Sequence, residues 1–417
     1  MVSIRVPEIY TMDNFDFGGK KVLVRVDFNS PVDPHTGTLI NVDRIVEHSK
    51  TIKELVEKGA AVVVVSHQGR PGEKDFISLE QHAKVLSKNL GFEVKFIDDV
   101  FGPKAREEIK KLKPNEVLVL DNLRLCSEEV IERPPGLQTR TFLVRKLAPL
   151  FNIFVLDAFA AAHRSQPSLV GFPVVLPSCA GRVMEKEVKA LQRIFSGEER
   201  PIIFILGGAK LSDSVRIIEF LLKNNAADKI LVTGLLSLLL LYAKDEDIGR
   251  DNVRVLEDKG ALSLVYKAKH ILRKYGDKIE LPIDYAVDVK GERTNKPLGE
   301  VNGRAKDIGE NTIKKYSEIL KEAKIVVLRG PAGVIEEPQF SIGSIELAKA
   351  AIEYGSFIVF GGGHMRIIAE RINAMNNEKV HVSTGGGALL MFLSGEPLPA
   401  LEALEISAKM FRGVKTV

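Results

Sequence analysis

The chain has 417 residues, 45% of them apolar, and this length and composition favour two globular domains over a single core. Its 59 basic and 55 acidic residues nearly cancel and form no long basic run, which argues against a protein that coats nucleic acid. The only two cysteines, Cys126 and Cys179, argue against a disulfide scaffold or a zinc site, and the longest apolar run, residues 230–243, is too short and interrupted to span a membrane.

The first half of the chain alternates short β-branched runs, turns and segments of helical periodicity. The N-terminal stretch MVSIRVPEIYTMDNFDFGGKK lacks an apolar segment of the signal-peptide type, so we expect a cytoplasmic protein. The expected strands are residues 21–26, 60–65, 93–97, 116–120 and 153–156. The alternation predicts a Rossmann-like α/β domain over residues 1–180, with a doubly wound parallel sheet covered on both faces.

The middle segment GRVMEKEVKALQRIFSG, residues 181–197, has apolar residues at helical spacing. We expect a helix that joins two domains, although a further surface helix of one domain fits this stretch equally well. The strands expected beyond it are residues 201–206, 229–233, 324–328, 357–360 and 380–382. They predict a second doubly wound domain over residues 198–395, followed by a short amphipathic helix within residues 396–417.

Arginines follow the strands of the first half. Ligands bind at the carboxyl ends of parallel strands, and the residues found there or opening the next helix are Asp27, Asn29, Arg44, His67, Arg70, Arg124 and Arg164. Arginine binds carboxylate and phosphate through paired hydrogen bonds, so converging arginines indicate a small polyanionic ligand. A solvated surface position explains any one of them, but explains the whole set poorly.

Glycines follow the strands of the second half, in ILGGAKLSDS, IVFGGGH and HVSTGGGALL. Glycine permits close approach to the backbone, and the amides of a helix N-terminus bind phosphate, so three such turns indicate a nucleotide. Tight turns also need glycine, which leaves each turn ambiguous by itself. Lys210 in GGAK is a candidate to neutralise phosphate charge, and the chain has no GxxxxGK[ST], complete GxGxxG, GxSxG or HExxH motif.

Seven segments in order, RVDFNSP, SHQGRP, DNLRL, DAFAAAHR, GGAK, GPAGVIE and STGGGA, resemble the phosphoglycerate kinase family over essentially the whole chain. The resemblance implies reversible phosphoryl transfer between 1,3-bisphosphoglycerate and ADP, giving 3-phosphoglycerate and ATP. It implies that the acid binds to the N-terminal domain and ADP or ATP with Mg²⁺ to the C-terminal one. It also implies that residues 396–417 pack back on the N-terminal domain.

The same resemblance assigns the site residues. The implied acid-substrate contacts are Asp27, Phe28, Asn29, Arg44, His67, Gln68, Gly69, Arg70, Arg124 and Arg164. The implied nucleotide contacts are Gly207, Gly208, Lys210, Glu336, Gly361, Gly362, Gly363 and His364. Arg44 and Lys210 are the expected catalytic residues, with Arg44 reaching the reacting centre and Glu336 holding the ribose.

Two positions depart from the commonest pattern of the family. Ser214 stands where many members have a second lysine, and His364 where many have an aspartate after the triple glycine. Both departures resemble the archaeal branch. They leave open how the transferring phosphoryl group is stabilised and which protein group, if any, binds the metal. Whether the chain is a monomer or a homodimer is also open.

The expected chemistry needs no general base, because both nucleophiles, a phosphate and a carboxylate, are ionised at pH 7. Substrates on separate domains predict closure about a hinge near residues 181–197. The rival enzyme is another ATP-dependent kinase that forms an acyl phosphate on a carboxylic acid. Rivals from other classes are an exported solute-binding protein, against which the missing signal peptide argues, and a nucleotide-dependent regulatory protein without turnover.

Overall fold

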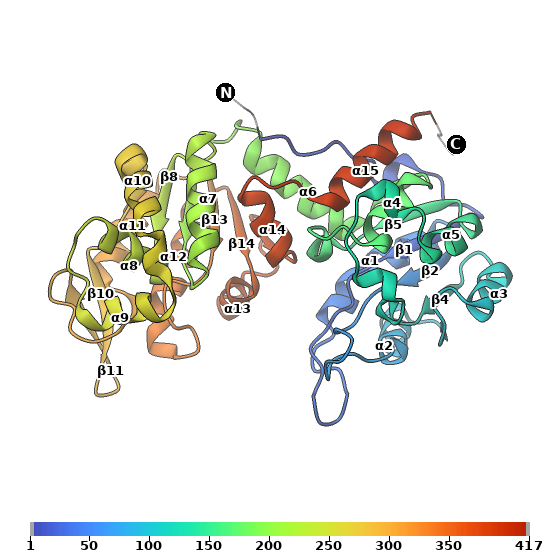
Figure 1. Cartoon of the computed structure of the whole chain (residues 1–417), viewed down its shortest axis with the longest axis horizontal. Coiled ribbons are helices and arrows are strands. Elements are labelled where there is room, and N and C mark those ends of the chain that lie inside the picture. Colours follow the sequence, from blue (N-terminus) through green and yellow to red (C-terminus); the bar gives the residue numbers. More distant parts are fainter. Residues whose placement is uncertain (1–3, 414–417) are drawn as a thin grey trace. The chain divides into compact units, whose positions relative to one another are not determined.

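The computed structural model describes residues 4–413, which divide into two compact units (Figure 1). The N-terminal unit is Pro7–Lys189 with residues 397–413, and the C-terminal unit is Ala190–Glu396 with residues 4–6. Within residues 4–413, no helix is long and apolar enough to cross a membrane. Each unit is an α/β domain with a six-stranded parallel sheet, so the predicted fold class is confirmed.

The sheet of the N-terminal unit has the strand order β3-β4-β2-β1-β5-β6. The strands are β1 (Lys21–Arg25), β2 (Ala61–Val65), β3 (Val94–Ile97), β4 (Val117–Leu120), β5 (Ile153–Leu156) and β6 (Ser178–Ala180). Five of them match the sequence prediction within a residue or two. The strands β2, β4 and β5 are apolar runs buried throughout, whereas β3 is a partly exposed edge strand. The sixth, β6, was missed because SCA has neither β-branched residues nor helical or alternating periodicity.

The helices of this unit are α1 (Asp43–Glu57), α2 (Glu80–Leu90), α3 (Pro103–Lys111), α4 (Pro135–Gln138) and α5 (Phe142–Leu147). On α1, Ile45, Ile52 and Leu55 recur at helical spacing and are fully buried. They join a core with Val22, Val24 and Val62 from one face of the sheet and residues of α2. This packing fixes the carboxyl ends of β1 and β2, where the predicted site residues lie.

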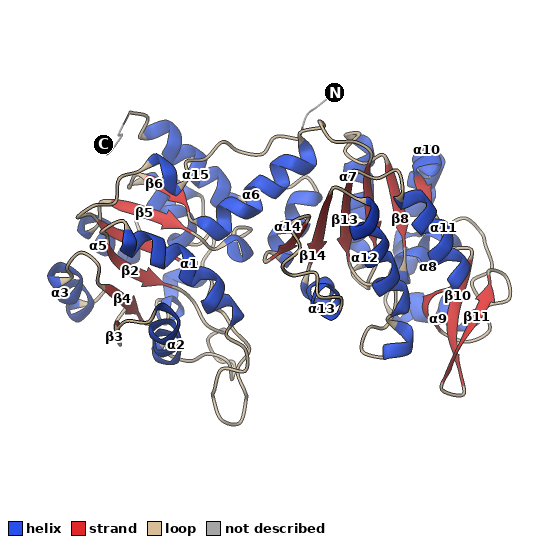
Figure 2. Ribbon diagram, turned by 180° about the vertical axis from the view of Figure 1, so that it is seen from behind, coloured by secondary structure: helices blue, strands red, loops and turns tan. Residues whose placement is uncertain are grey.

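The C-terminal unit has the strand order β15-β14-β13-β7-β8-β9. Its parallel strands are β7 (Ile202–Leu206), β8 (Lys229–Val232), β9 (Ile279–Glu280), β13 (Ile325–Arg329), β14 (Phe357–Gly361) and β15 (Val380–Ser383). Its helices are α7 (Leu211–Lys223), α8 (Gly234–Ala243), α9 (Arg250–Asp258), α10 (Val265–Tyr275), α11 (Glu310–Leu320), α12 (Ile342–Tyr354), α13 (Gly363–Arg371) and α14 (Gly386–Leu393). Helices α11 to α13 pack on a sheet face that includes Ile205, Val326 and Phe360 (Figure 2).

A small antiparallel sheet, absent from the sequence prediction, adds to the C-terminal unit. It has the order β11-β10-β12, with β10 (Asp284–Val289), β11 (Glu292–Pro297) and β12 (Ala305–Ile308). The strand β11, ERTNKP, is polar and partly exposed throughout, so no apolar alternation marks it in the sequence. The turn Lys290–Gly291 has positive φ at both residues, as a tight hairpin requires.

Two further helices lie at or beyond the boundary between the units. Helix α6 (Arg182–Phe195) covers the segment predicted to join the domains, and the division between the units falls inside it, after Lys189. Helix α15 (Pro399–Met410) packs on the N-terminal unit. The amide of Ala400 donates to the carbonyl of Ala162 at 3.2 Å, and Ser407 Oγ donates to the carbonyl of Leu176 at 3.1 Å.

Both six-stranded sheets reverse their direction of strand addition in the middle. In the N-terminal unit the reversal lies between β1 and β5, and in the C-terminal unit between β7 and β13. Loops that leave two such strands turn in opposite directions and open a crevice at the carboxyl edge, which is where open α/β sheets bind ligands. The topology therefore provides one candidate crevice in each unit.

Arg182, at the start of α6, ties three distant segments of the N-terminal unit together. Its guanidinium contacts both carboxylate oxygens of Glu54 at 2.6 and 2.7 Å and both of Asp13 at 2.6 and 2.9 Å. A fifth bond, of 2.7 Å, joins it to Glu185. The hydrogen bonds from Arg182 lower the pKa of Asp13 and of Glu54, with burial opposing both shifts. The network holds α6 to α1 and to the segment before β1.

We predict that Arg182→Gln lowers the free energy of unfolding of the N-terminal unit by about 1–2 kcal/mol at pH 7. A bidentate, partly buried network contributes more to stability than an isolated ion pair at the surface. Depressed carboxylate pKa values stabilise the fold above the unfolded values of 3.8 and 4.5, and this contribution is lost as the pH falls through the folded values. In urea unfolding, the free energies of unfolding of Arg182→Gln and the parent protein should therefore differ less at pH 3 than at pH 7.

Lys53→Gln is the control, since Lys53 only approaches the exposed Glu57 at 3.9 Å and should change stability little. A difference for Arg182→Gln that is the same at both pH values would contradict the role given to its carboxylate partners.

Candidate functional site

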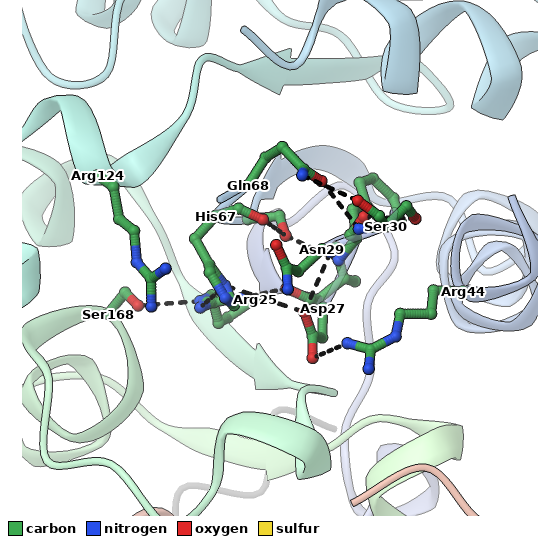
Figure 3. A network of polar contacts seen from close by, with 12 residues as sticks. Arg25, Asp27, Asn29, Ser30, Arg44, His67, Gln68, Arg124 and Ser168 are labelled. Carbon is green, nitrogen blue, oxygen red and sulfur yellow. Dashed lines mark hydrogen bonds and ion pairs between the residues drawn. The ribbon is translucent and has the colours of Figure 1, made fainter. Parts of the chain in front are cut away.

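Three loops at the carboxyl edge of the N-terminal sheet are bonded into one shelf (Figure 3). Asn29, after β1, accepts a hydrogen bond of 2.9 Å from the amide of Gly69, after β2. Asn122, after β4, accepts from the amide of Gln68 at 3.2 Å and donates to its carbonyl at 2.7 Å. Gly69 has φ +65°, and a Cβ there would lie 2.3 Å from the carbonyl oxygen of Asp75, so only glycine fits. The shelf is therefore rigid.

Two of the predicted substrate contacts support this shelf with their side chains. Phe28 is fully buried and stacks on His82, and its backbone amide donates a hydrogen bond of 2.9 Å to Ser66 Oγ. The amide side chain of Gln68 accepts from the amide of Ser30 at 2.8 Å and donates to its carbonyl at 2.9 Å. Both residues are thus held within the protein through side chain and backbone alike, so they support the shelf.

Asp27 is the buried carboxylate at the centre of the cluster. Its side chain is 4% exposed, and Arg44 Nη1 donates to its Oδ2 at 2.6 Å. His67 Nδ1 lies 3.9 Å from Oδ1. Burial acts to raise the pKa of Asp27, but the nearby charges, Arg44 first and Arg25 as well, lower it well below its usual range. Asp27 is therefore an anion that anchors cations, as Figure 3 shows.

Arg25 was missed by the sequence analysis, although an arginine inside the apolar strand KVLVR is itself a signal of function. Its side chain is fully buried and donates from Nη2 to His67 Nδ1 at 3.0 Å and from Nε to Ser168 Oγ at 2.9 Å. Burial first, and then Arg25, Arg124 and Arg164, hold the pKa of His67 well below 6.5 despite Asp27. His67 is neutral at pH 7.

The remaining arginines crowd the same edge. Arg124 is buried, donates from Nη1 to the carbonyl of Gly69, and has no hydrogen-bond partner at Nε. Burial and the charge of Arg164, followed by Arg25, lower the pKa of Arg124 to about 10, and Arg70 contributes in the same direction. Because like charges destabilise one another here, the arrangement calls for an anionic ligand.

The crevice of the C-terminal unit is formed by backbone. Gly207, after β7, and Gly330, after β13, pack so closely that a Cβ on Gly207 would lie 2.4 Å from the carbonyl of Pro331, and one on Gly330 2.3 Å from the carbonyl of Gly207. Beside them lies a cavity of about 260 Å³. Its lining includes Gly208, Gly234, Leu238, Tyr285, Glu336 and His364.

Of the predicted nucleotide contacts, Gly208, Glu336 and His364 line this cavity, and Lys210 and Gly363 lie within two residues of them along the chain. Lys210 is the exposed N-cap residue of α7, and Gly363 begins α13 after Gly362, whose φ is +95°. His364 Nε2 lies 3.6 Å from Glu336 Oε1, and both side chains are more than half exposed. Ser214, which stands where many family members have lysine, is 1% exposed on the inner face of α7, so it is not available to a ligand at the surface.

The wall of the cavity away from the glycine turns comes from the antiparallel sheet that the sequence analysis missed. Tyr285 of β10 is buried, and its hydroxyl lies 2.7 Å from Ser237 Oγ of α8. Lys306 of β12 accepts at its carbonyl from the amide of Val334 at 2.8 Å, which fixes the loop GPAGVIE. No predicted residue lies on this wall, because its contacts arise only from the tertiary fold.

The predicted residues thus form two groups, one in each unit, and comparisons with known proteins identify the family. A model described as phosphoglycerate kinase matches residues 12–396. The chain is 53% identical over 414 residues to the phosphoglycerate kinase of Sulfurisphaera tokodaii, covering 99% of this chain and 100% of that protein, and 47% identical over 403 residues to that of Methanothermus fervidus, covering 96% and 98%.

Solved structures agree with these matches. The crystal structure of phosphoglycerate kinase from Pyrococcus horikoshii OT3 superposes with a TM-score of 0.87 at 43% identity, covering 97% of this chain and all of that one. The structure from Coxiella burnetii gives a TM-score of 0.81 at 31% identity, with 95% and 99% covered. On the family model, the full-length relatives and the shared fold, the chain belongs to the phosphoglycerate kinase family.

Proposed function

We propose that this chain transfers a phosphoryl group reversibly between 1,3-bisphosphoglycerate and ADP, giving 3-phosphoglycerate and ATP. The observation that carries the proposal is the arginine cluster on a rigid shelf in one unit, alongside a glycine-lined cavity in the other. Arginines suit a small acid that carries both carboxylate and phosphate, and backbone amides at helix starts suit a polyphosphate. Membership of the phosphoglycerate kinase family indicates which reaction these two sites would carry out together.

The acid substrate is assigned to the N-terminal unit. Arg70, Arg124 and Arg164 supply guanidinium donors for its phosphate, and the unpartnered Nε of Arg124 is one such donor. Asn29 and the neutral His67 supply uncharged polar contacts beside Asp27. Because these groups lie on bonded loops, little ordering is needed when the acid binds.

The nucleotide is assigned to the cavity of the C-terminal unit. The apolar side chains of Leu238 and the neighbouring Leu235, together with the ring of Tyr285, suit the base, and Glu336 at the cavity lining suits the ribose hydroxyls. The turns at 207–208 and 361–363 lead into the helices α7 and α13, whose N-termini favour phosphate. Lys210 and His364 add side chains at these helix starts.

Magnesium is proposed to enter with the nucleotide. Within residues 4–413, no group of three or more His, Cys, Asp or Glu side chains is arranged to hold a metal ion. Mg²⁺ commonly takes most of its ligands from water and substrate phosphates, so a protein cage is not required. When bound, the ion neutralises charge on the phosphate oxygens. Lys210 and the glycine turns would hold those phosphates.

The reaction itself needs position and positive charge. The attacking oxygen is ionised in either direction, so no protein group has to remove a proton. Arg44 and Lys210 are assigned to neutralise charge on the transferring group, which is the main demand of phosphoryl transfer. The anion Asp27 orients Arg44 through one of its five N–H donors and leaves the others available.

The first prediction from this proposal is rapid ATP consumption with 3-phosphoglycerate and magnesium when a coupled step removes the acyl phosphate. Turnover should lie within the usual range for kinases, about 1–100 per second, and should vanish without 3-phosphoglycerate. Acetate, aspartate and glutamate test the rival acid kinase and should support no turnover. Equal rates with those acids, or no turnover although both ligands bind, would argue against the proposed substrate.

A second prediction concerns Arg44→Ala. Its charge is assigned to the transition state, so kcat should fall about 100- to 1,000-fold while the KM for 3-phosphoglycerate changes less than about threefold. Arg145→Ala is the matched control, because Arg145 is an exposed arginine on α5 of the same unit. An unchanged kcat, or a loss confined to KM, would remove Arg44 from the reacting centre.

A third prediction follows from placing the two substrates on different units. Transfer requires the reacting atoms to approach within roughly 3–3.5 Å, so we propose a closing motion with the hinge near residues 181–197. Small-angle X-ray scattering should show a smaller radius of gyration with 3-phosphoglycerate and a nucleotide together than with either alone. The same radius in all three samples would contradict the closing motion.

A further inference from the structure

A buried chain of polar groups runs from the arginine cluster into the interior of the N-terminal unit. Arg25 Nε donates to Ser168 Oγ at 2.9 Å. Ser168 donates twice to Glu129, from its amide to Oε2 at 3.1 Å and from its hydroxyl to Oε1. All three residues are fully buried, and none was predicted from the sequence as a site residue. The chain ends at His67, which the other side of Arg25 contacts.

We propose that Glu129, acting through Ser168 and Arg25, is a positioning residue that holds His67 in the tautomer protonated at Nε2. His67 then meets the acid substrate as a neutral hydrogen-bond donor. The proposal rests on the proposed function only for the identity of that substrate. The arrangement of protons in the unliganded protein follows from the contacts alone.

The tautomer follows from the donors available. A guanidinium has N–H donors and no acceptor, so at 3.0 Å from Arg25 Nη2 the Nδ1 atom of His67 must accept. A neutral imidazole whose Nδ1 accepts carries its proton on Nε2. Protonation of Nδ1 would set two donors against each other in a buried site. The low pKa of His67 agrees with this, since burial and the neighbouring arginines disfavour the cation.

Ser168 makes the contact of Arg25 directional. Its hydroxyl proton is committed to Glu129, so the lone pairs of Oγ remain to accept from Arg25 Nε. Both oxygens of Glu129 accept, which is the pattern of an ionised carboxylate. Burial raises the pKa of Glu129, and the charge of Arg25 opposes that rise. The carboxylate also offsets repulsion between Arg25 and the other arginines.

The four groups that face His67 come from three segments. Arg25 lies at the end of β1, Asp27 follows it, and Arg124 and Arg164 belong to the loops after β4 and β5. Three of these four are cations. Arg25 interacts with two buried carboxylates, Glu129 first and then Asp27. Loss of the Glu129 charge would leave the attraction of Asp27 unopposed, so the guanidinium would turn towards Asp27 and release Nδ1.

The test is Glu129→Gln, read by nitrogen-15 NMR of the histidine side chains. The His67 resonances are assigned with His67→Asn. In the parent protein, we expect His67 to stay neutral and protonated at Nε2 from pH 8 to pH 5.5. In Glu129→Gln, we expect His67 to stay neutral but to become a mixture of the Nδ1-protonated and Nε2-protonated tautomers. The KM for 3-phosphoglycerate should rise about tenfold with kcat within about twofold, as expected for one charge-assisted hydrogen bond.

Glu128→Gln is the matched control. Glu128 is the neighbouring glutamate, and it accepts from the amides of Phe142 and Leu143 at the start of α5 rather than from Ser168. We expect the NMR signals of His67 and the KM to be unchanged in this variant. If the nitrogen-15 signals of His67 changed by the same amount in both variants, the specific role of Glu129 would be overturned.

Ser168→Ala provides a second route if Glu129→Gln does not fold. It keeps the carboxylate but removes the acceptor of Arg25 Nε, so His67 should again lose its fixed tautomer. A folded variant of either kind in which His67 remains neutral and protonated at Nε2 alone would overturn the proposal. If the parent protein shows this signal yet lacks turnover, the proposed function fails while the positioning of His67 is supported.

Discussion

Repulsion among buried positive charges is the constraint on which the N-terminal site depends. Arg25 and Arg124 are buried, with Arg164 and Arg70 nearby, and burial first and then the charges of Arg164 and Arg25 lower the pKa of Arg124. Desolvated cations are tolerated only when anions and hydrogen-bond acceptors surround them. Asp27 and Glu129 supply two carboxylates, and the loop carbonyls supply further acceptors. A deficit of negative charge remains, which favours a polyanion at this site and supports the proposed assignment of the acid substrate to it.

In the C-terminal unit, backbone amides in place of arginine side chains provide positive charge for an anionic ligand. Close approach of the turns after β7 and β13 is possible because Gly207 and Gly330 have no Cβ. Amides at the starts of α7 and α13 then carry partial positive charge without a desolvated cation. A nucleotide that brings magnesium needs less charge from the protein than a bare acid does. The two sheets differ in strand order, but each has a switch point, and the donors at these two points differ.

The parts of this architecture that the sequence predicted are those set by local pattern. Ten parallel strands were found because runs such as AVVVV and IIFIL are apolar on both faces. The polar strand β11 and the short strands β6 and β9 lack that pattern and depend on their neighbours. Arginines at strand ends were visible in order along the chain, whereas the link from Glu129 to Ser168 joins residues 39 apart and exists only after folding. Arg25 could have been predicted as a site residue, because burying a charged side chain inside a strand is costly and therefore rare without a function.

Arg44 connects the shelf to the proposed reacting centre. Its side chain is 39% exposed, yet one guanidinium nitrogen is held at 2.6 Å by a carboxylate that is itself fixed by burial and by its cationic neighbours. An exposed arginine without such an anchor would sample many rotamers and lose entropy on each turnover. The contact to Asp27 restricts that freedom beforehand and leaves the other donors of Arg44 available for the role proposed for it. Because that carboxylate stays ionised far below neutral pH, the orientation of Arg44 persists across the pH range in which both substrates are ionised.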